Sequence, residues 1–318
     1  MRALFFGTPA IAVPALEALA SLADVAGVVC QPDRPAGRGL ELRAPPVKER
    51  ALALGLEVVQ PTKIRTEEFA EWVRSRQADV ALVIAYGRIL PPALLAAPRR
   101  GCMNLHASIL PKYRGAAPIT WAIVRGESET GISLMQMDEG CDTGPVFSIT
   151  RTPIGPEQTA DELFEVMGRL AADVVRADLA RAVAGELEAA PQDGAAATEA
   201  PLLEKSDGRV PWGKAARAVH DHVRGMTSWP GAATTTRDGK GLKLLSTRVA
   251  TEAGTRGAPG TVLRADRGGI EVACGEGALC ILRAQRESKR AADASELVSG
   301  RALAVGDVLG FDPSAQRG

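Results

Sequence analysis

Short apolar runs alternate with segments of helical spacing over the first third of the chain. Each run is bounded by turn residues, which predicts buried strands at residues 3–6, 25–30 and 80–85. Apolar positions at helical spacing or helical composition predict helices at residues 13–22, 47–54 and 67–76. Strands that are apolar throughout and separated by helices are typical of a buried parallel sheet. We therefore expect an α/β fold here.

The pattern changes after a further apolar strand at residues 102–106. Residues 131–137 and 146–150 are separated by glycines and an aspartate, which predicts an antiparallel addition to the sheet. A capping box at residues 159–162 predicts the start of an amphipathic helix. The α/β region thus extends to about residue 184.

Residues 185–204 are rich in Ala, Glu and Pro with little periodicity, which is typical of a linker. One helical segment follows at residues 213–224. Short β-rich segments with turn glycines then cover residues 232–236, 242–249, 260–264, 270–274 and 279–286. Their spacing predicts a second domain that is a small β-barrel.

The composition is that of an ordinary globular protein. The 318 residues carry 38 Lys and Arg against 38 Asp and Glu, which excludes a general basic coat for nucleic acid but not a local basic patch. No stretch approaches the roughly 18 apolar residues of a spanning helix, and the first apolar run is too short for a signal peptide. Five scattered cysteines without a C-x-x-C motif indicate a reducing compartment. We expect a cytoplasmic protein without a membrane segment.

Asn104 and His106 lie at the end of an apolar strand, where ligands bind in open parallel sheets. They alternate with Leu105, so both side chains point to one side of the strand. A lone histidine is usually structural, but the paired asparagine favours a functional site. The segment MQMDEGCDTGP after a strand offers a carboxylate partner from Asp138, Glu139 or Asp142, and Asp142 lies in its glycine-flanked part.

An amide, an imidazole and a carboxylate together suit acyl transfer to an amine. The first two hydrogen-bond a developing oxyanion, while the carboxylate tunes the imidazole and moves the proton of the amine. No Ser or Cys lies in a nucleophile elbow, which argues against a covalent acyl-enzyme. The turn after the first strand lacks G-x-G-x-x-G, which argues against a dinucleotide-dependent oxidoreductase. His220 and His222 do not share a helical face and lack partners for a metal site, so we interpret them as solvated helix residues.

A long loop with four prolines follows the second strand, over residues 31–48. Long irregular loops within compact domains are usually functional or disordered. The basic residues of this loop suit the phosphates of an RNA, and a solvated surface loop is the alternative. These residues are Arg34, Arg38, Arg43 and Lys48.

Together these segments resemble the bacterial and organellar methionyl-tRNA formyltransferases over nearly the whole chain. NLHASILPKYRGAAP at residues 104–118 and ETGISLMQMDEGCDTG at 129–144 resemble signatures of the wider folate-dependent formyltransferase superfamily. More specific to the tRNA enzymes are QPDRPAGRG at 31–39 and a second domain with VPW and SWP. The remaining segments of resemblance are FGTP at 6–9 and VIAYGRILP at 83–91.

The resemblance implies a Rossmann-like formyltransferase domain at residues 1–188, a linker at 189–206 and an OB-like, tRNA-binding β-barrel at 207–318. The implied reaction transfers the formyl group of 10-formyltetrahydrofolate to the methionine amine of initiator methionyl-tRNA, for translation initiation. It requires no metal, no membrane and no obligate protein partner.

The site residues are carried over by position. Those implied to be catalytic are Asn104, His106 and Asp142. Those implied to bind folate are Ser108, Ile109, Leu110 and Pro111, together with Tyr86, Gly87, Arg88, Ile89 and Leu90. Those implied to contact tRNA are Arg34, Arg38 and Arg43. The chain departs from the family pattern at Arg88, where an apolar residue is usual, at Ala107 and Ile109 in the signature, and at Leu40 and Glu41, where lysines often follow.

Three other functions compete with this interpretation. Related enzymes formylate an amino sugar on a nucleotide or a purine precursor, and they share the catalytic trio; the arginine loop and the second domain favour tRNA. A non-catalytic RNA-binding protein would not need the trio. A nicotinamide dehydrogenase would need the missing glycine motif.

Overall fold

The computed structural model describes residues 1–36, 41–300 and 302–310, and it confirms an α/β domain followed by an antiparallel β domain. The chain divides into two units, each assembled from three segments. The parallel-sheet unit comprises Met1–Pro118, Glu129–Pro153 and Phe164–Pro201. The antiparallel unit comprises Ile119–Ser128, Ile154–Leu163 and Leu202–Gly318. The predicted linker of residues 189–206 is therefore divided between the two.

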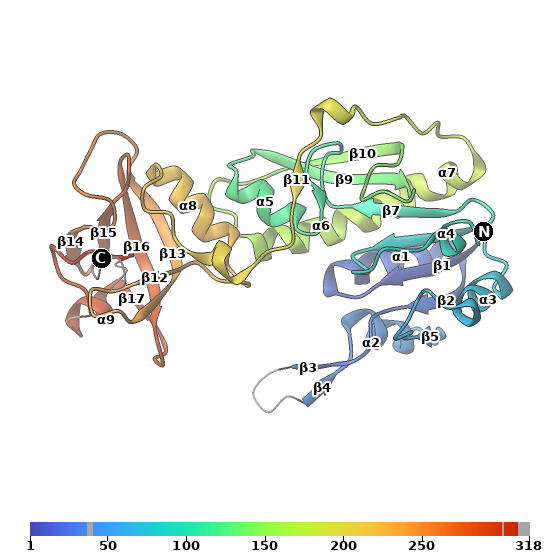
Figure 1. Ribbon diagram of the computed structural model, residues 1–318, viewed down its shortest axis with the longest axis horizontal. Coiled ribbons are helices and arrows are strands. Elements are labelled where there is room, and N and C mark those ends of the chain that lie inside the picture. The colour runs from blue at the N-terminus through green and yellow to red at the C-terminus, as the bar shows by residue number, and fades with distance from the viewer. Residues whose placement is uncertain (37–40, 301, 311–318) are drawn as a thin grey trace. The chain divides into compact units, whose positions relative to one another are not determined.

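The parallel-sheet unit is built on one twisted sheet in the order β10-β9-β7-β6-β1-β2-β5 (Figure 1). β5, β2, β1, β6 and β7 are mutually parallel, in the order of the first five strands of a Rossmann sheet. β9 pairs antiparallel with β7, and β10 pairs antiparallel with β9, which confirms the predicted antiparallel addition. The strands are β1 (Arg2–Gly7), β2 (Asp24–Val29), β5 (Val58–Val59), β6 (Val80–Ile84), β7 (Cys102–His106), β9 (Glu129–Gln136) and β10 (Val146–Pro153).

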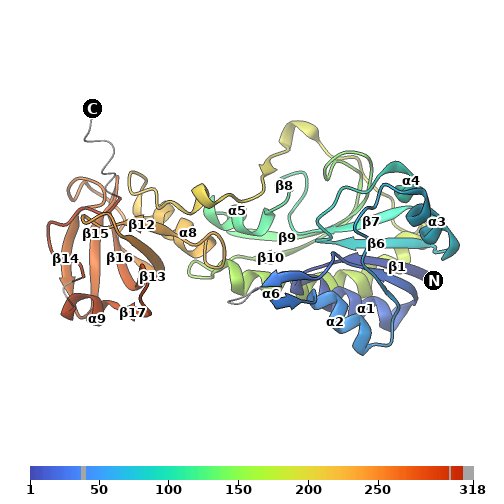
Figure 2. The same cartoon turned by 60° about the horizontal axis from the view of Figure 1, so that its bottom comes forward.

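Helices cover both faces of this sheet, with α1 and α2 on one face and α3 and α4 on the other (Figure 2). Leu4 and Phe6 of β1 pack with Phe69 and Val73 of α3 in one buried cluster. Such packing on both faces explains why the strands are apolar throughout. The helices are α1 (Val13–Leu22), α2 (Pro46–Ala53), α3 (Glu67–Ser75), α4 (Pro92–Leu95), α6 (Ala160–Val174) and α7 (Ala180–Ala184), with short turns of helix at Ala10–Ala12, Val175–Leu179 and Gly194–Ala196.

The antiparallel unit has a sheet in the order β12-β13-β16-β15-β14, with β17 paired to β16. Val219 and Val223 of α8 are buried with Leu242, Leu244 and Ile281 of this sheet. The strands are β12 (Ala233–Thr235), β13 (Gly241–Thr251), β14 (Val262–Asp266), β15 (Gly269–Ala273), β16 (Ala278–Arg286) and β17 (Ala291–Asp293). The helices are α5 (Pro118–Val124), α8 (Ala216–Gly225) and α9 (Ala294–Ser299), with a short turn of helix at Lys205–Gly208.

His220 and His222 of α8 are buried, so the prediction that they are solvated was wrong. The two residues are 3% and 7% exposed. Residues 219–225 are all buried, so α8 is enclosed around most of its circumference. The pattern of a surface helix, in which one face is apolar and the other is solvated, therefore does not apply to it. His220 Nδ1 lies 3.0 Å from Thr247 Oγ1 of β13.

α8 also carries a buried ion pair. Arg224 Nε donates to Asp221 Oδ1 at 2.7 Å, and the two side chains are 7% and 6% exposed. Arg224 also donates through one terminal nitrogen to the carbonyl oxygens of Gln158 at 2.7 Å and Gly155 at 3.3 Å. The pair thereby joins α8 to residues 154–163, which lie far away in the sequence but in the same unit.

The two buried histidines predict a loss of stability on acidification. Burial lowers the pKa of His220, although the Glu157 carboxylate opposes this shift, and burial also lowers the pKa of His222. Both rings therefore take up protons at lower pH in the folded protein than in the unfolded chain, where histidines titrate near pH 6.5. Their stabilisation is present above that pH and is lost as the pH falls further.

We expect the melting temperature to fall between pH 7.5 and 5.5, in calorimetry at constant ionic strength. His222→Gln should flatten that dependence, since it removes one of the two groups. A slope identical to that of the wild type in this variant would contradict the assignment.

Within the described ranges, no helix combines the length and the apolar character needed to cross a bilayer.

Candidate active site

The predicted segments meet at the carboxyl edge of the parallel sheet. The turn after β1, the loop after β2, residues 85–91 after β6 and residues 107–111 after β7 all follow parallel strands, whose carboxyl ends share one edge. Phe6 aligns with Val83 and Val83 with Asn104 in the strand register. Phe6 and Val83 pack with residues of α3 and α4, and aligned residues of neighbouring strands point to the same face. Asn104 and His106 therefore lie on the face of the sheet that α3 and α4 cover.

Asn104, His106 and Asp142 come together at this edge. Asn104 Nδ2 donates to Asp142 Oδ1 at 3.3 Å, and His106 Nδ1 lies 3.5 Å from Asp142 Oδ2. Asp142 is in the loop between β9 and β10. The structure thus brings this carboxylate to His106, whereas Asp138 accepts hydrogen bonds within its own turn from Gly140 N and Thr143 Oγ1.

The ring of His106 is fixed from its other side. The residue is 5% exposed, and Nε2 lies 2.8 Å from the carbonyl oxygen of Tyr113. A carbonyl only accepts hydrogen bonds, so Nε2 carries the proton of this contact. Nδ1 consequently faces the Asp142 carboxylate.

Asp142 is held in an uncommon backbone conformation, with φ of +54°. Its Oδ2 accepts a hydrogen bond from the Gly115 amide at 2.9 Å. Two residues later, a Cβ on Gly144 would overlap the Gln136 carbonyl oxygen, so only glycine allows this close approach. The Gly115 amide and the close approach at Gly144 therefore both fix the position of the Asp142 carboxylate.

The residues predicted to bind folate after β7 divide into two groups. Ser108 is fully buried and donates from Oγ to the Lys112 carbonyl at 2.6 Å, so its hydroxyl points into the protein. Leu110 is also buried, and its amide donates to Ser133 Oγ at 3.1 Å. Ile109 and Pro111 are partly exposed.

The segment after β6 divides in the same way. Tyr86 and Leu90 are each 2% exposed; the ring of Tyr86 packs edge-on against Phe6, and burial raises the pKa of Tyr86 to about 12. Ile89 is 68% exposed, and Gly87 is exposed with φ of +81°. The outward surface here consists largely of a glycine backbone and one isoleucine.

Arg88 makes contacts that tie this segment to the loop after β2. Its Nε donates to Gln31 Oε1 at 3.1 Å, and a terminal nitrogen donates to the Thr62 carbonyl at 2.9 Å. Gln31 in turn donates from Nε2 to the Tyr86 carbonyl at 3.1 Å. Because these bonds occupy its guanidinium, Arg88 braces two loops in this structure.

The predicted RNA loop begins and ends as a hairpin, β3 (Arg34–Ala36) and β4 (Glu41–Arg43), which extends away from the sheet beside α2 (Figure 1). Arg34 and Arg43 are exposed and directly opposite each other across it. Arg38 lies outside the described residues. Lys48 is in α2 and pairs with Asp33 at 2.8 Å, and this hydrogen bond lowers the pKa of the Asp33 carboxyl.

Residues 190–200, all of which were predicted to belong to the linker, also lie at the site. β11 (Glu199–Ala200) pairs in parallel with β8 (Arg114–Gly115), next to the amide that holds Asp142. Gln192 contacts the Asp142 loop itself. Sequence reasoning missed these residues because a partner about 50 positions away leaves no local periodicity.

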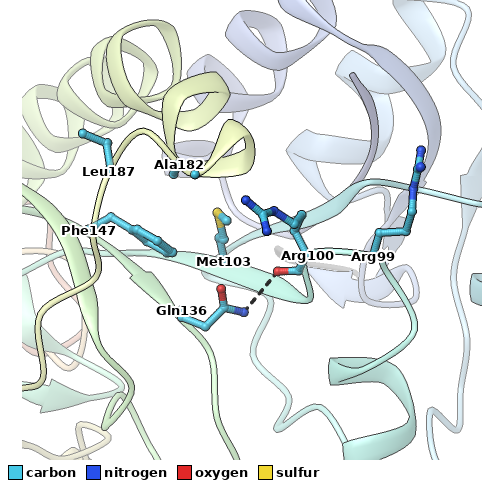
Figure 3. Close-up of a pocket in the computed structure, with 8 residues that line it drawn as sticks. Arg99, Arg100, Met103, Gln136, Phe147, Ala182 and Leu187 are labelled. Carbon is cyan, nitrogen blue, oxygen red and sulfur yellow. Dashed lines mark hydrogen bonds between the residues drawn. The ribbon is translucent and has the colours of Figure 1, made fainter.

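A cavity of about 360 Å³ lies elsewhere in the unit, beside the start of β7 (Figure 3). Met103 lines it and alternates with Asn104, so the cavity is on the opposite face of the sheet from the trio. Gln136 donates there to the Arg100 carbonyl at 3.4 Å. None of the predicted site residues lines this cavity.

Among the residues that the structure describes, no group of three or more His, Cys, Asp or Glu side chains is arranged to hold a metal ion.

Comparisons with solved structures show the fold. A sugar 3N-formyl transferase, WlaRD, solved in the presence of dTDP and 5-N-formyl-THF, is 16% identical with a TM-score of 0.66 over 91% of this chain and 99% of its own. A methionyl-tRNA formyltransferase from Clostridium thermocellum is 16% identical with a TM-score of 0.54 over 78% of this chain and 93% of its own.

Comparisons of sequence show the family. Family models for the formyl transferase domain and the formyl transferase C-terminal domain match residues 1–175 and 202–302. The chain is 69% identical to a methionyl-tRNA formyltransferase from Sorangium cellulosum, over 98% of this chain and all of the relative. It is 49% identical to one from Myxococcus xanthus, over 96% of each. The chain therefore belongs to the methionyl-tRNA formyltransferase family.

Proposed function

We propose that this protein transfers the formyl group of 10-formyltetrahydrofolate to the α-amino group of methionine on initiator methionyl-tRNA, in the cytoplasm, for translation initiation. The observation that carries the proposal is the convergence of Asn104, His106 and Asp142 at the carboxyl edge of the sheet. It occurs in a chain that aligns over its length with methionyl-tRNA formyltransferases.

The proposed reaction is direct attack of the unprotonated methionyl amine on the formyl carbon. The new bond joins the amine nitrogen to the formyl carbon, and the bond from that carbon to N10 of the folate breaks. Negative charge develops on the formyl oxygen, where Asn104 Nδ2 donates a hydrogen bond, and His106 donates a second one once its Nε2–H turns from the Tyr113 carbonyl to that oxygen. Asp142 orients the ring and relays the amine proton, which N10 takes as it leaves.

We propose that the folate lies against the outward residues of the two loops. Ile109 and Pro111 supply apolar surface after β7, and Gly87 and Ile89 supply it after β6. Ser108, Leu110, Tyr86 and Leu90 would act from within, because their side chains are buried and fix the course of the loops.

The hairpin is the proposed contact for the acceptor end of the tRNA. Arg34 and Arg43 are directly opposite on its two strands, and like charges so placed destabilise a hairpin. A phosphate bound between them removes this repulsion. The proposal assigns catalysis to the parallel-sheet unit and further tRNA backbone contacts to the antiparallel unit.

Arg34→Gln with Arg43→Gln is expected to weaken tRNA binding and to leave the KM for folate unchanged. Each lost phosphate contact should reduce the slope of log K against log salt concentration by about one. The measurement is filter binding of methionyl-tRNA across a salt series. Arg169→Gln, an exposed arginine of α6, is the control. Unchanged affinity and slope in the double variant would exclude the hairpin from the interface.

The decisive test of the function is transfer of labelled formyl from 10-formyltetrahydrofolate to three acceptors in parallel. They are methionyl initiator tRNA, methionyl elongator tRNA and a nucleotide-linked amino sugar. Transfer to the initiator alone is expected. Transfer only to the sugar would replace the acceptor and keep the trio, whereas tRNA binding without transfer to any acceptor would favour a non-catalytic RNA-binding protein.

A further inference from the structure

Residues 190–200 form a strap that is fixed at both ends against the catalytic loops. Ala190 exchanges two backbone hydrogen bonds with Val146, at 2.8 and 2.9 Å, where the Asp142 loop joins β10. At the other end, Thr198 accepts from the Arg114 amide with its carbonyl oxygen at 2.8 Å and from the Tyr113 amide with Oγ1 at 2.9 Å. The strap thus spans both segments that contact the trio.

Gln192 lies between these ends and joins the two segments through one side chain. Its Nε2 donates to the carbonyl oxygens of Asp142 at 2.8 Å and Gly144 at 2.7 Å. Its Oε1 accepts from Arg114 Nε at 3.1 Å and from a terminal nitrogen of Arg114 at 2.8 Å. Both the donor and the acceptor end of this amide are therefore directed at the site.

These contacts bear directly on the position of the Asp142 carboxylate. Asp142 has a positive φ, a conformation that is uncommon outside glycine and that persists where the surroundings hold it. Gln192 fixes the carbonyl groups on both sides of Thr143, so it sets the turn that aims Asp142 at His106. Gln192 also holds Arg114, whose two neighbours in the chain contact the trio. The Tyr113 carbonyl accepts from His106, and the Gly115 amide donates to Asp142.

We propose that Gln192 is a positioning residue for the transfer step, and that the strap is part of the catalytic site and not a spacer between domains. The proposal rests on the proposed function, in which Asp142 takes part in moving a proton. A misplacement of a reacting group by about 1 Å costs roughly 10²-fold in rate. Loss of the Gln192 amide is therefore expected to lower kcat.

Gln192→Leu tests the proposal with a side chain of similar size that can neither donate nor accept. We expect kcat to fall by about 10- to 100-fold, with both KM values within about twofold of the wild type. Asp193→Ala is the matched control, because Asp193 caps the turn within the strap and accepts from the Ala195 amide. A Gln192→Leu protein with normal kcat would overturn the proposal.

Gln192→Glu separates the two halves of the amide. A glutamate still accepts from Arg114, but it places a carboxylate oxygen against the carbonyl oxygens of Asp142 and Gly144. If the donor half positions Asp142, Gln192→Glu is at least as slow as Gln192→Leu. Normal kcat in Gln192→Glu would show that the anchoring of Arg114 suffices, and it would overturn the assignment that the donor half of the amide positions Asp142.

A double-variant cycle with Asp142→Asn distinguishes positioning from general destabilisation. If Gln192 acts through Asp142, Gln192→Leu should cost little further rate in the Asp142→Asn background. Full additivity of the two losses would overturn the proposal. Failure of the proposed function gives a different result, because the wild-type protein itself would then transfer no formyl group to methionyl-tRNA.

Discussion

Asp142→Asn is expected to slow formyl transfer by about 10²- to 10⁴-fold, the range that a positioned proton-transfer group supplies. Asparagine has nearly the same shape and can still accept from the Gly115 amide, so the loop should keep its course. It cannot, however, take up the amine proton. The loss should therefore appear in kcat, with both KM values little changed.

Single-turnover transfer to methionyl initiator tRNA is the measurement for this variant, with product followed as labelled formylmethionyl ester. Asp138→Asn is the matched control. Asp138 is a carboxylate in the same loop, and it accepts hydrogen bonds from Gly140 N and Thr143 Oγ1 within its own turn. Normal transfer by Asp142→Asn would remove Asp142 from the mechanism.

Arg224→Met is expected to destabilise the antiparallel unit by about 3–5 kcal/mol, the usual effect of removing one partner from a buried ion pair. The Asp221 carboxylate would remain buried without its guanidinium. The carbonyl groups of Gly155 and Gln158 would lose the same donor. Chemical denaturation followed by Trp fluorescence gives the change in unfolding free energy.

A control for this variant lies on the same helix. Arg217 pairs with Glu157 and Glu252 while 43% exposed, and Arg217→Met should cost no more than about 1 kcal/mol. The double variant Asp221→Leu with Arg224→Met should be more stable than Arg224→Met alone, because it leaves no unpaired buried charge. Equal effects of Arg217→Met and Arg224→Met would contradict the importance of burial.

Much of the fold follows from local patterns. The helix predicted at residues 13–22 is α1, and the strand predicted at 102–106 is β7, because apolar spacing and turn residues act over a few positions. The side of β7 on which Asn104 and His106 lie follows from strand alternation alone. Their approach to Asp142 does not follow from strand order, because β9 runs antiparallel to β7 and the loop that carries Asp142 begins beside the start of β7.

Other features depend on packing between distant segments. The burial of His220 and His222 is set by what covers α8, which no pattern within α8 reveals. The hydroxyl of Ser108, a residue expected at the folate, donates inward to the Lys112 carbonyl. The sequence could not predict this direction, since side chains in an irregular loop have no periodicity. Gln192 lies in an alanine-rich segment, so its contacts with the catalytic loops could not be predicted from composition.

The interleaving of the two units limits how the chain can be recombined with its relatives. Residues 154–163 precede the α8 helix by more than fifty positions, yet they supply the carbonyl groups around Arg224. A chimaera joined at residue 202 would pair an α8 from one parent with a 154–163 segment from the other. Functional hybrids should therefore exchange residues 119–128 and 154–163 together with the carboxyl-terminal part, as one inherited module.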